Sequence, residues 1–187
     1  MTLLRSKDKR NREYKGYLNE ETILCLLDEI SDESNMRWIW IDKFVEFESG
    51  KRAVAIKNVT LAEEHLHDHF PGFAVMPEAL MIEGMAQTAG ILVGEASGPD
   101  EKVILAKIQK AAFYDYVVPG DTLKLSAQIE SMAAEAAGTT GEITSNDKLI
   151  AHIDLIFSHL DRNLSGKQFP EENFVFTDIF KFLLSVS

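Results

Sequence analysis

The sequence is short of cysteine, of long apolar stretches and of positive charge, and each shortage excludes a class of protein. Its single cysteine, Cys25, cannot form an internal disulfide, which fits a reducing cytoplasm. No run of about 18 apolar residues is present, so we expect no membrane-spanning helix. Charges stand near the N-terminus where the apolar core of a signal peptide would lie, which predicts a cytoplasmic protein rather than an exported one.

Acidic residues outnumber basic ones, and the net formal charge of the 187 residues is −11. Residues 1–15 hold six basic and two acidic side chains and carry +4, which leaves −15 for the remainder. Because an acidic body repels a polyanion, we expect no nucleic-acid partner for the folded part. We interpret residues 1–15 as a basic, flexible arm, with contact to RNA, a membrane or an acidic partner as the alternative.

Hydrophobic periodicity divides the rest of the chain into helical and extended segments. An apolar stripe at helical spacing follows Asn19, and apolar positions from Leu149 to Phe157 alternate with polar ones, as in a strand with one buried face. The expected elements, in chain order, are a helix over 19–30, strands over 36–48 and 52–59, a loop over 60–77, a helix over 78–93, and strands over 102–114, 122–132, 138–144 and 149–157.

The helix over 78–93 is apolar on nearly every side, which is typical of a buried helix. Four strands follow it, and this order favours an α+β fold in which one antiparallel sheet wraps around the helix. We expect a single domain over 16–162, because the chain has enough apolar residues for one substantial core. Residues 163–187 are expected to form a C-terminal extension with a short helix.

A histidine and a glutamate are the strongest candidates for chemistry. His69 begins the segment H-F-P-G in a loop shaped by proline and glycine, and Glu83 follows fourteen positions later in the apolar helix. A base held apart from an acid in an apolar setting is suited to proton transfer near neutral pH. Taken singly, each also fits an ordinary role, as a hydrogen-bonded loop histidine and an exposed helix carboxylate.

Two segments carry a family resemblance. Residues 65–90 contain H-F-P-G, then M-P, then E-G-M-A-Q, and residues 107–123 read K-I-Q-K-A-A-F-Y-D-Y-V-V-P-G-D-T-L. Both resemble the signatures of the 3-hydroxyacyl-acyl-carrier-protein dehydratases of fatty-acid synthesis. The sequence departs from that pattern at Asp68, Ala74 and Glu78, and the family's P-H-R-Y-P segment is not recognisable around residues 31–41.

The resemblance implies a hotdog fold, in which a curved antiparallel sheet wraps around a long central helix. It implies a homodimer, or a higher assembly of dimers, whose active sites each take a histidine from one subunit and an acid from the other. His69 would be the base and Glu83 the acid. The substrate would be a 3-hydroxyacyl chain on acyl carrier protein, dehydrated to the trans-2-enoyl thioester without a cofactor.

Further side chains are expected around these two. Backbone N–H groups near Gly72 and at the helix start, at Glu78, are free to stabilise an oxyanion. Gln87 lies one turn after Glu83, so its amide either orients the carboxyl or is merely exposed. Phe113 ends the strand over 102–114, close to the expected acyl tunnel.

Docking of an acidic carrier on an acidic body requires a local basic patch. Lys107, Lys110 and Lys124 lie near the second signature, and strand parity predicts that Lys110 faces away from Lys107. Lys110 and Lys124 are therefore the expected docking residues. The alternative is that these lysines simply solvate a face of the sheet.

Three other interpretations stay open at this point. His65, His67 and His69 alternate as zinc ligands on an extended segment do, but the bend at Pro71 interrupts a regular strand and the resemblance implies no metal. A hotdog thioesterase would use the helix carboxylate to activate water and would not need H-F-P-G. A hotdog domain that binds acyl thioesters without turnover is the remaining alternative, and the presence of both His69 and Glu83 favours the dehydratase.

Overall fold

The computed structural model describes residues 3–5, 14–17, 39–98 and 103–159. The expected helices over 19–30 and within 163–187 lie outside the described residues, as does Cys25. The chain divides into two units, residues 1–38 and 39–187. In the first, strands β1 (Leu3–Arg5) and β2 (Tyr14–Tyr17) pair antiparallel, with Leu3 opposite Tyr17.

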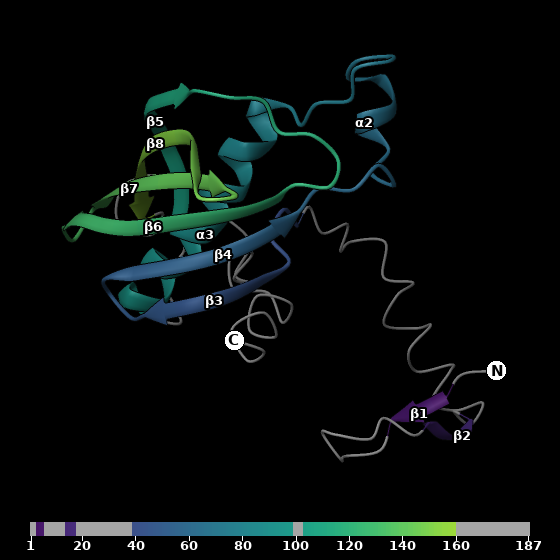
Figure 1. Cartoon of the computed structure of the whole chain (residues 1–187). Coiled ribbons are helices and arrows are strands. Elements are labelled where there is room, and N and C mark those ends of the chain that lie inside the picture. The colour runs from purple at the N-terminus through teal and green to yellow at the C-terminus, as the bar shows by residue number, and fades with distance from the viewer. Residues whose placement is uncertain (1–2, 6–13, 18–38, 99–102, 160–187) are drawn as a thin grey trace, which may run out of the picture. The chain divides into compact units, whose positions relative to one another are not determined.

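The second unit contains a six-stranded antiparallel sheet of order β3-β4-β6-β7-β8-β5 (Figure 1). Four of its strands follow the long helix, as the sequence predicted, and their ends agree with the prediction to within two residues. Asn146 and Asp147 both have positive φ, so β7 and β8 are joined by a tight two-residue turn. The strands are β3 (Lys43–Glu48), β4 (Arg52–Asn58), β5 (Val103–Phe113), β6 (Thr122–Met132), β7 (Ala136–Ser145) and β8 (Lys148–His159).

Helix α3 (Glu78–Ser97) lies along one face of this sheet and contacts β4, β5, β6, β7 and β8. Its side chains are buried on most sides, among them Met81, Met85 and Leu92. Gly141 of β7 allows the closest approach, because a Cβ there would stand 2.4 Å from Sδ of Met85. The predicted α+β architecture, a hotdog fold with a central helix, is confirmed. No helix in the described ranges meets the length and hydropathy needed to span a bilayer.

Two segments differ from the sequence-based expectation. Of the strand expected over 36–48, residues 36–38 lie outside the described residues, and the described part becomes strand only at Lys43. The backbone N–H of Trp40 donates to the side chain of Gln87 on α3 and not to a neighbouring strand. The loop over 60–77 contains a single helical turn, α2 (His65–Asp68), which buries Leu66.

The two edges of the sheet differ in exposure and charge. Strand β3 is short, carries Lys43, Glu46 and Glu48, and has a register shift against β4. Strand β5 pairs with β8 on one side, and no described strand pairs with its other side. Residues 105–111 of β5 are all exposed, including the apolar Leu105 and Ile108. Long exposed edge strands with apolar side chains are common places for another chain to add.

Candidate functional site

The loop that carries His69 is a tight turn held by its own backbone. The N–H of Phe73 donates to the carbonyl of Phe70 at 2.8 Å, and Phe70 N–H donates back to Phe73 O at 2.8 Å. Pro71 stands at the first central position and Gly72, with φ of 78°, at the second. A proline followed by a residue at positive φ is the signature of a type II turn, so the P-G sequence shapes this loop directly.

The imidazole of His69 is fixed at one ring nitrogen. Its Nδ1 lies 3.0 Å from the carbonyl oxygen of Val75, whose own N–H donates to His69 O at 2.9 Å. Because a carbonyl oxygen only accepts, Nδ1 carries the hydrogen, and Nε2 of the neutral ring keeps its lone pair. The ring is half-buried and stacks on Phe70 with centroids 4.2 Å apart. The sequence alone did not identify Val75 as the residue that sets this tautomer.

The start of α3 lies immediately beyond Val75. Pro77 occupies the N-cap position and makes no side-chain capping hydrogen bond, while Glu78 is exposed in the first turn. The first N–H groups of a helix have no intrahelical acceptor, so they are available to an anionic ligand. Gly72 is exposed, and a Cβ built on it would meet no atom within 4 Å. The two expected oxyanion positions therefore lie three and nine residues after His69, at the exposed Gly72 and at the first residue of α3.

Glu83 lies about 8 Å further along the axis of α3, five residues after Glu78. Its Oε1 accepts a hydrogen bond from Nε2 of Gln87 at 2.9 Å, and Oε1 of Gln87 accepts from the backbone N–H of Trp40 at 2.8 Å. Since the N–H of Trp40 can only donate, the oxygen of the Gln87 amide faces Trp40 and its NH₂ group faces Glu83. The amide is thus half-buried and bonded at both ends rather than simply exposed.

The residue that anchors Gln87 is itself held by charged and aromatic neighbours. Nζ of Lys57 lies 5.6 Å from the ring centroid of Trp40 and 2.9 Å from Oε2 of Glu63. His65 meets the same indole edge-on, with centroids 5.3 Å apart. Burial lowers the pKa of His65, against the charge of Glu63, and its Nε2 has no hydrogen-bond partner among the described residues.

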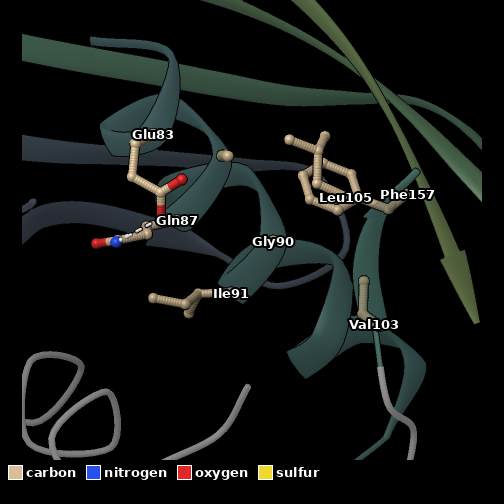
Figure 2. Close-up of a pocket in the computed structure, with 8 residues that line it drawn as sticks. Glu83, Gln87, Gly90, Ile91, Val103, Leu105 and Phe157 are labelled. Carbon is tan, nitrogen blue, oxygen red and sulfur yellow. Dashed lines mark hydrogen bonds between the residues drawn. The ribbon is translucent and has the colours of Figure 1, made fainter. Parts of the chain in front are cut away.

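A pocket of about 160 Å³ opens beside Glu83 (Figure 2). Glu83 and Gln87 lie one turn apart on α3, and Gly90 follows further along the same helix. Leu105 of β5 and Phe157 of β8 line the pocket on the side of the sheet. Apart from the glutamate and glutamine the lining is apolar, so the pocket has one polar end and an apolar body. Its lining residues are Glu83, Ala86, Gln87, Gly90, Ile91, Val103, Leu105 and Phe157.

The structure of one chain brings some predicted residues together and keeps others apart. Glu83 and Gln87 share the pocket, whereas His69 is not among the residues that line it. Phe113 also stands outside this lining, at the end of β5 opposite to Val103 and Leu105, where it packs against the core. The pocket walls from β5 and β8 carry no catalytic side-chain type, so no sequence motif marked them.

The lysines expected to form one patch are separated. Lys110 lies opposite Asp154 of β8, and Lys124 lies opposite Thr144 of β7. The sheet order puts three strand spacings between them, about 14 Å, and the registers offset them by four to five residues, about 14 to 17 Å, along the strands. The parity argument for Lys110 is wrong, because the register shift between Ile108 and Lys110 places Lys107 and Lys110 opposite Ile156 and Asp154, which share one face of β8.

The three histidines of the 65–69 segment do not lie on an extended strand. His65 and His67 belong to α2, and His69 follows at its C-cap, so alternate residues point in different directions. Nε2 of His67 contacts the carbonyl oxygen of Leu61 at 2.8 Å. The alternation in sequence therefore does not bring three nitrogens onto one face.

Comparison with known proteins gives a family for residues 31–154, which match the model of the FabA-like domain. The chain is 38% identical over 125 residues to the 3-hydroxyacyl-[acyl-carrier-protein] dehydratase FabZ of Thermomicrobium roseum, covering 66% of this chain and 84% of the relative. It is 37% identical over 137 residues to the protein of the same description from Solibacter usitatus, covering 72% of this chain and 83% of the relative.

Solved structures of similar fold include the dehydratase heterocomplex ApeI:P from Xenorhabdus doucetiae, with a TM-score of 0.55 and 16% identity over 65% of this chain and 82% of that one. The protein smu.793 of Streptococcus mutans, solved with acetyl CoA, gives a TM-score of 0.53 and 16% identity over 69% and 95% of the two chains. At this identity the likeness concerns the fold.

Proposed function

This chain belongs to the FabA-like family, and from that premise we propose that it dehydrates 3-hydroxyacyl thioesters on acyl carrier protein to trans-2-enoyl thioesters in fatty-acid synthesis. The observation that carries the proposal is the pair His69 and Glu83, one with a free ring nitrogen and the other at the polar end of an apolar pocket. The curated relatives, at 37–38% identity, are named for this reaction.

In the proposed reaction His69 is the base. Its Nε2 takes the proton from C2 of the substrate, and the electron pair of that C–H bond moves onto the thioester oxygen. The hydrogen bond from Nδ1 to the carbonyl of Val75 holds the ring in the tautomer that leaves Nε2 unprotonated and able to accept the proton. Nε2 returns the proton to solvent after product leaves.

Glu83 is the proposed acid. Its carboxyl protonates the hydroxyl on C3, which departs as water while the electron pair returns from the oxygen to form the C2–C3 double bond. The hydrogen bond from Gln87 occupies Oε1, so the amide fixes the rotamer of the carboxyl and turns it toward the pocket. A proton from solvent restores Glu83 for the next cycle.

The negative charge that develops on the thioester oxygen requires donors placed in advance. We assign this role to backbone N–H groups at Gly72, three residues after His69, and at the start of α3 around Glu78, nine residues after it. The side chain of Glu78 is exposed and takes no part in this step. Phe113, packed on the core at the end of β5, is assigned to the wall of the substrate channel.

We propose that the active unit is a homodimer, or an assembly of homodimers, with two shared sites. Two observations support it: His69 does not line the pocket of Glu83 in its own chain, and residues 105–111 of β5 are exposed along an edge with which no described strand pairs. Leu105 belongs both to this edge and to the pocket, so a second copy docked on β5 would lie beside Glu83. The partner's His69 then supplies the missing base.

Acyl carrier protein is the proposed partner, and Lys110 and Lys124 are the proposed docking residues. Because they lie on different strands and are opposed by different neighbours, each is a separate contact rather than half of one patch. We further propose a cytoplasmic location, in keeping with a single cysteine.

The test is direct turnover. The purified protein is incubated with trans-2-enoyl and 3-hydroxyacyl thioesters, and interconversion is followed by the absorbance of the conjugated enoyl thioester. The proposal expects conversion in both directions to one equilibrium ratio. Hydrolysis to free thiol would instead identify a thioesterase, and binding without conversion would identify a carrier of acyl thioesters.

A further inference from the structure

Gly90, in the middle of α3, is buried against the ring of Phe157. A Cβ built at this position would stand 3.2 Å from Cε1 of Phe157, with Cζ and Cδ1 at 3.8 and 3.9 Å. Glycine in a helix interior is destabilising relative to alanine, and Gly90 does not have a positive φ that would require it. The close approach of the Phe157 ring is therefore the structural reason for a glycine here.

The ring of Phe157 has little room to move. Phe157 is 2% exposed and lies on β8 directly opposite Ala137 of β7 and Leu105 of β5. Ala137 is fully buried and small, while Leu105 stands at the exposed edge and also lines the pocket. The ring thus crosses from β8 to the helix surface and forms a wall of the pocket together with Gly90 (Figure 2).

This wall lies at a fixed distance from the reacting group. Gly90 is seven residues after Glu83, about 10 Å along the helix axis. Between them Ala86 and Leu105 supply apolar lining, and no charged residue other than Glu83 borders the pocket. A substrate whose C3 hydroxyl meets Glu83 would therefore extend its hydrocarbon tail toward Gly90 and Phe157.

We propose that Phe157 and Gly90 set the chain-length limit, and that this pocket selects short and medium acyl chains. Its volume of about 160 Å³ is close to that of an engineered apolar cavity of about 150 Å³ that admits benzene, a ligand of six carbons. The part of the pocket that one chain forms therefore takes a tail of about six carbons beyond the reacting carbons. This inference rests on the proposed function and adds the class of acyl chain that the site accepts.

The test compares hydration of trans-2-enoyl thioesters from butenoyl to dodecenoyl, all on one carrier, by the loss of enoyl absorbance. The full-length protein should show its highest kcat/KM on octenoyl substrates, whose tail beyond C3 has five carbons, and a loss of about tenfold or more by dodecenoyl. Phe157→Leu opens the wall and should raise the decenoyl-to-hexenoyl ratio of kcat/KM by about tenfold. Gly90→Ala fills the same space from the helix side and should lower that ratio.

Phe44→Leu is the matched control, because Phe44 on β3 is equally buried but does not line the pocket. It should cost comparable stability and leave the ratio unchanged. An unchanged ratio in both wall variants, or an equal change in the control, would overturn the inference while wild-type turnover stood. Gly90→Ala keeps the test decisive if Phe157→Leu does not fold. A wild type that converts no enoyl thioester would overturn the proposed function, and this inference with it.

Discussion

The amide of Gln87 donates a hydrogen bond to the carboxyl of Glu83 at 2.9 Å, one turn away on the same helix. The other end of that amide accepts from the backbone of Trp40, which precedes the first strand of the sheet. The orientation of the proposed acid therefore depends on a contact between α3 and a chain segment 47 residues from Gln87. Gln87 acts on the reaction through Glu83 and is a positioning residue.

Gln87→Glu is expected to separate this role from a purely structural one. The new side chain still accepts from Trp40 N–H but sets a second carboxyl against Glu83, so kcat should fall about tenfold to a hundredfold with little change in KM. The pH dependence of kcat should also shift, because two adjacent carboxyls share protons. Gln128→Glu, at an exposed position on β6, is the control. An unchanged pH profile of kcat would show that Gln87 has a structural role only and does not position Glu83.

Removal of either proposed catalytic group should end turnover without unfolding the chain. His69→Ala and Glu83→Ala are each expected to lower kcat/KM by at least about a hundredfold, the factor that general acid–base catalysis supplies. Circular dichroism and thermal unfolding check that the fold persists. His67→Ala and Glu95→Ala, at exposed positions on α2 and α3, should retain activity. Retention of most activity by a variant of His69 or Glu83 would remove that residue from the mechanism.

Mixing the two inactive variants tests the shared site. Hybrid dimers of His69→Ala and Glu83→Ala carry one intact site and one doubly altered site, so subunit exchange should restore part of the wild-type kcat. Exchange is verified independently with labelled protomers. If labelled hybrids form and remain inactive, each chain must supply both groups to its own site.

Charge reversal should affect carrier-bound substrates selectively. Lys110→Glu and Lys124→Glu are each expected to raise KM for acyl-carrier substrates severalfold at low salt, and the effect should shrink as ionic strength screens it. A short soluble thioester should be turned over as before. Lys43→Glu, exposed on the opposite edge strand, serves as the control. Equal effects on both substrates, or none, would exclude Lys110 and Lys124 as docking residues. The basic residues within 1–15 would then be the next candidates for carrier docking.

His65 predicts a pH dependence of stability. Burial against Trp40 lowers its pKa in the folded state, so the unfolded chain binds more protons below about pH 6.5. The free energy of unfolding should therefore decrease as pH falls through that value. His65→Phe keeps a ring beside Trp40 and removes the titrating group, so its stability should vary less between pH 7 and 5. Urea titrations of both proteins at several pH values measure the difference, and parallel pH curves would contradict it.

The sequence predicted most of the sheet and the central helix because strands and helices impose periods of two and 3.6 on their apolar residues. It failed at residues 39–42, since nothing in that apolar stretch reveals that the N–H of Trp40 is bound by Gln87. It failed at Lys110 because a register shift between Ile108 and Lys110 breaks the alternation on which parity depends.

The residues of the candidate site also divide into those that the sequence predicted and those that it did not. Glu83 and Gln87 were found together because residues four apart face each other on a helix. Gly90 and Phe157 were not, because their contact joins a helix to a strand 67 residues later and involves residue types common in any core. Local spacing is visible in a sequence, whereas the walls of a pocket depend on how distant segments meet.

The unequal edges of the sheet bear on how far assembly can proceed. If β5 pairs with β5 of a second copy, the two sheets join about a two-fold axis. The β5 edge of each chain is then paired and can accept no further strand. The outer edges of the joined sheet are then two copies of β3, each short, charged and shifted in register. Growth strand by strand stops at two chains, so the edge chemistry favours a closed particle over a fibre.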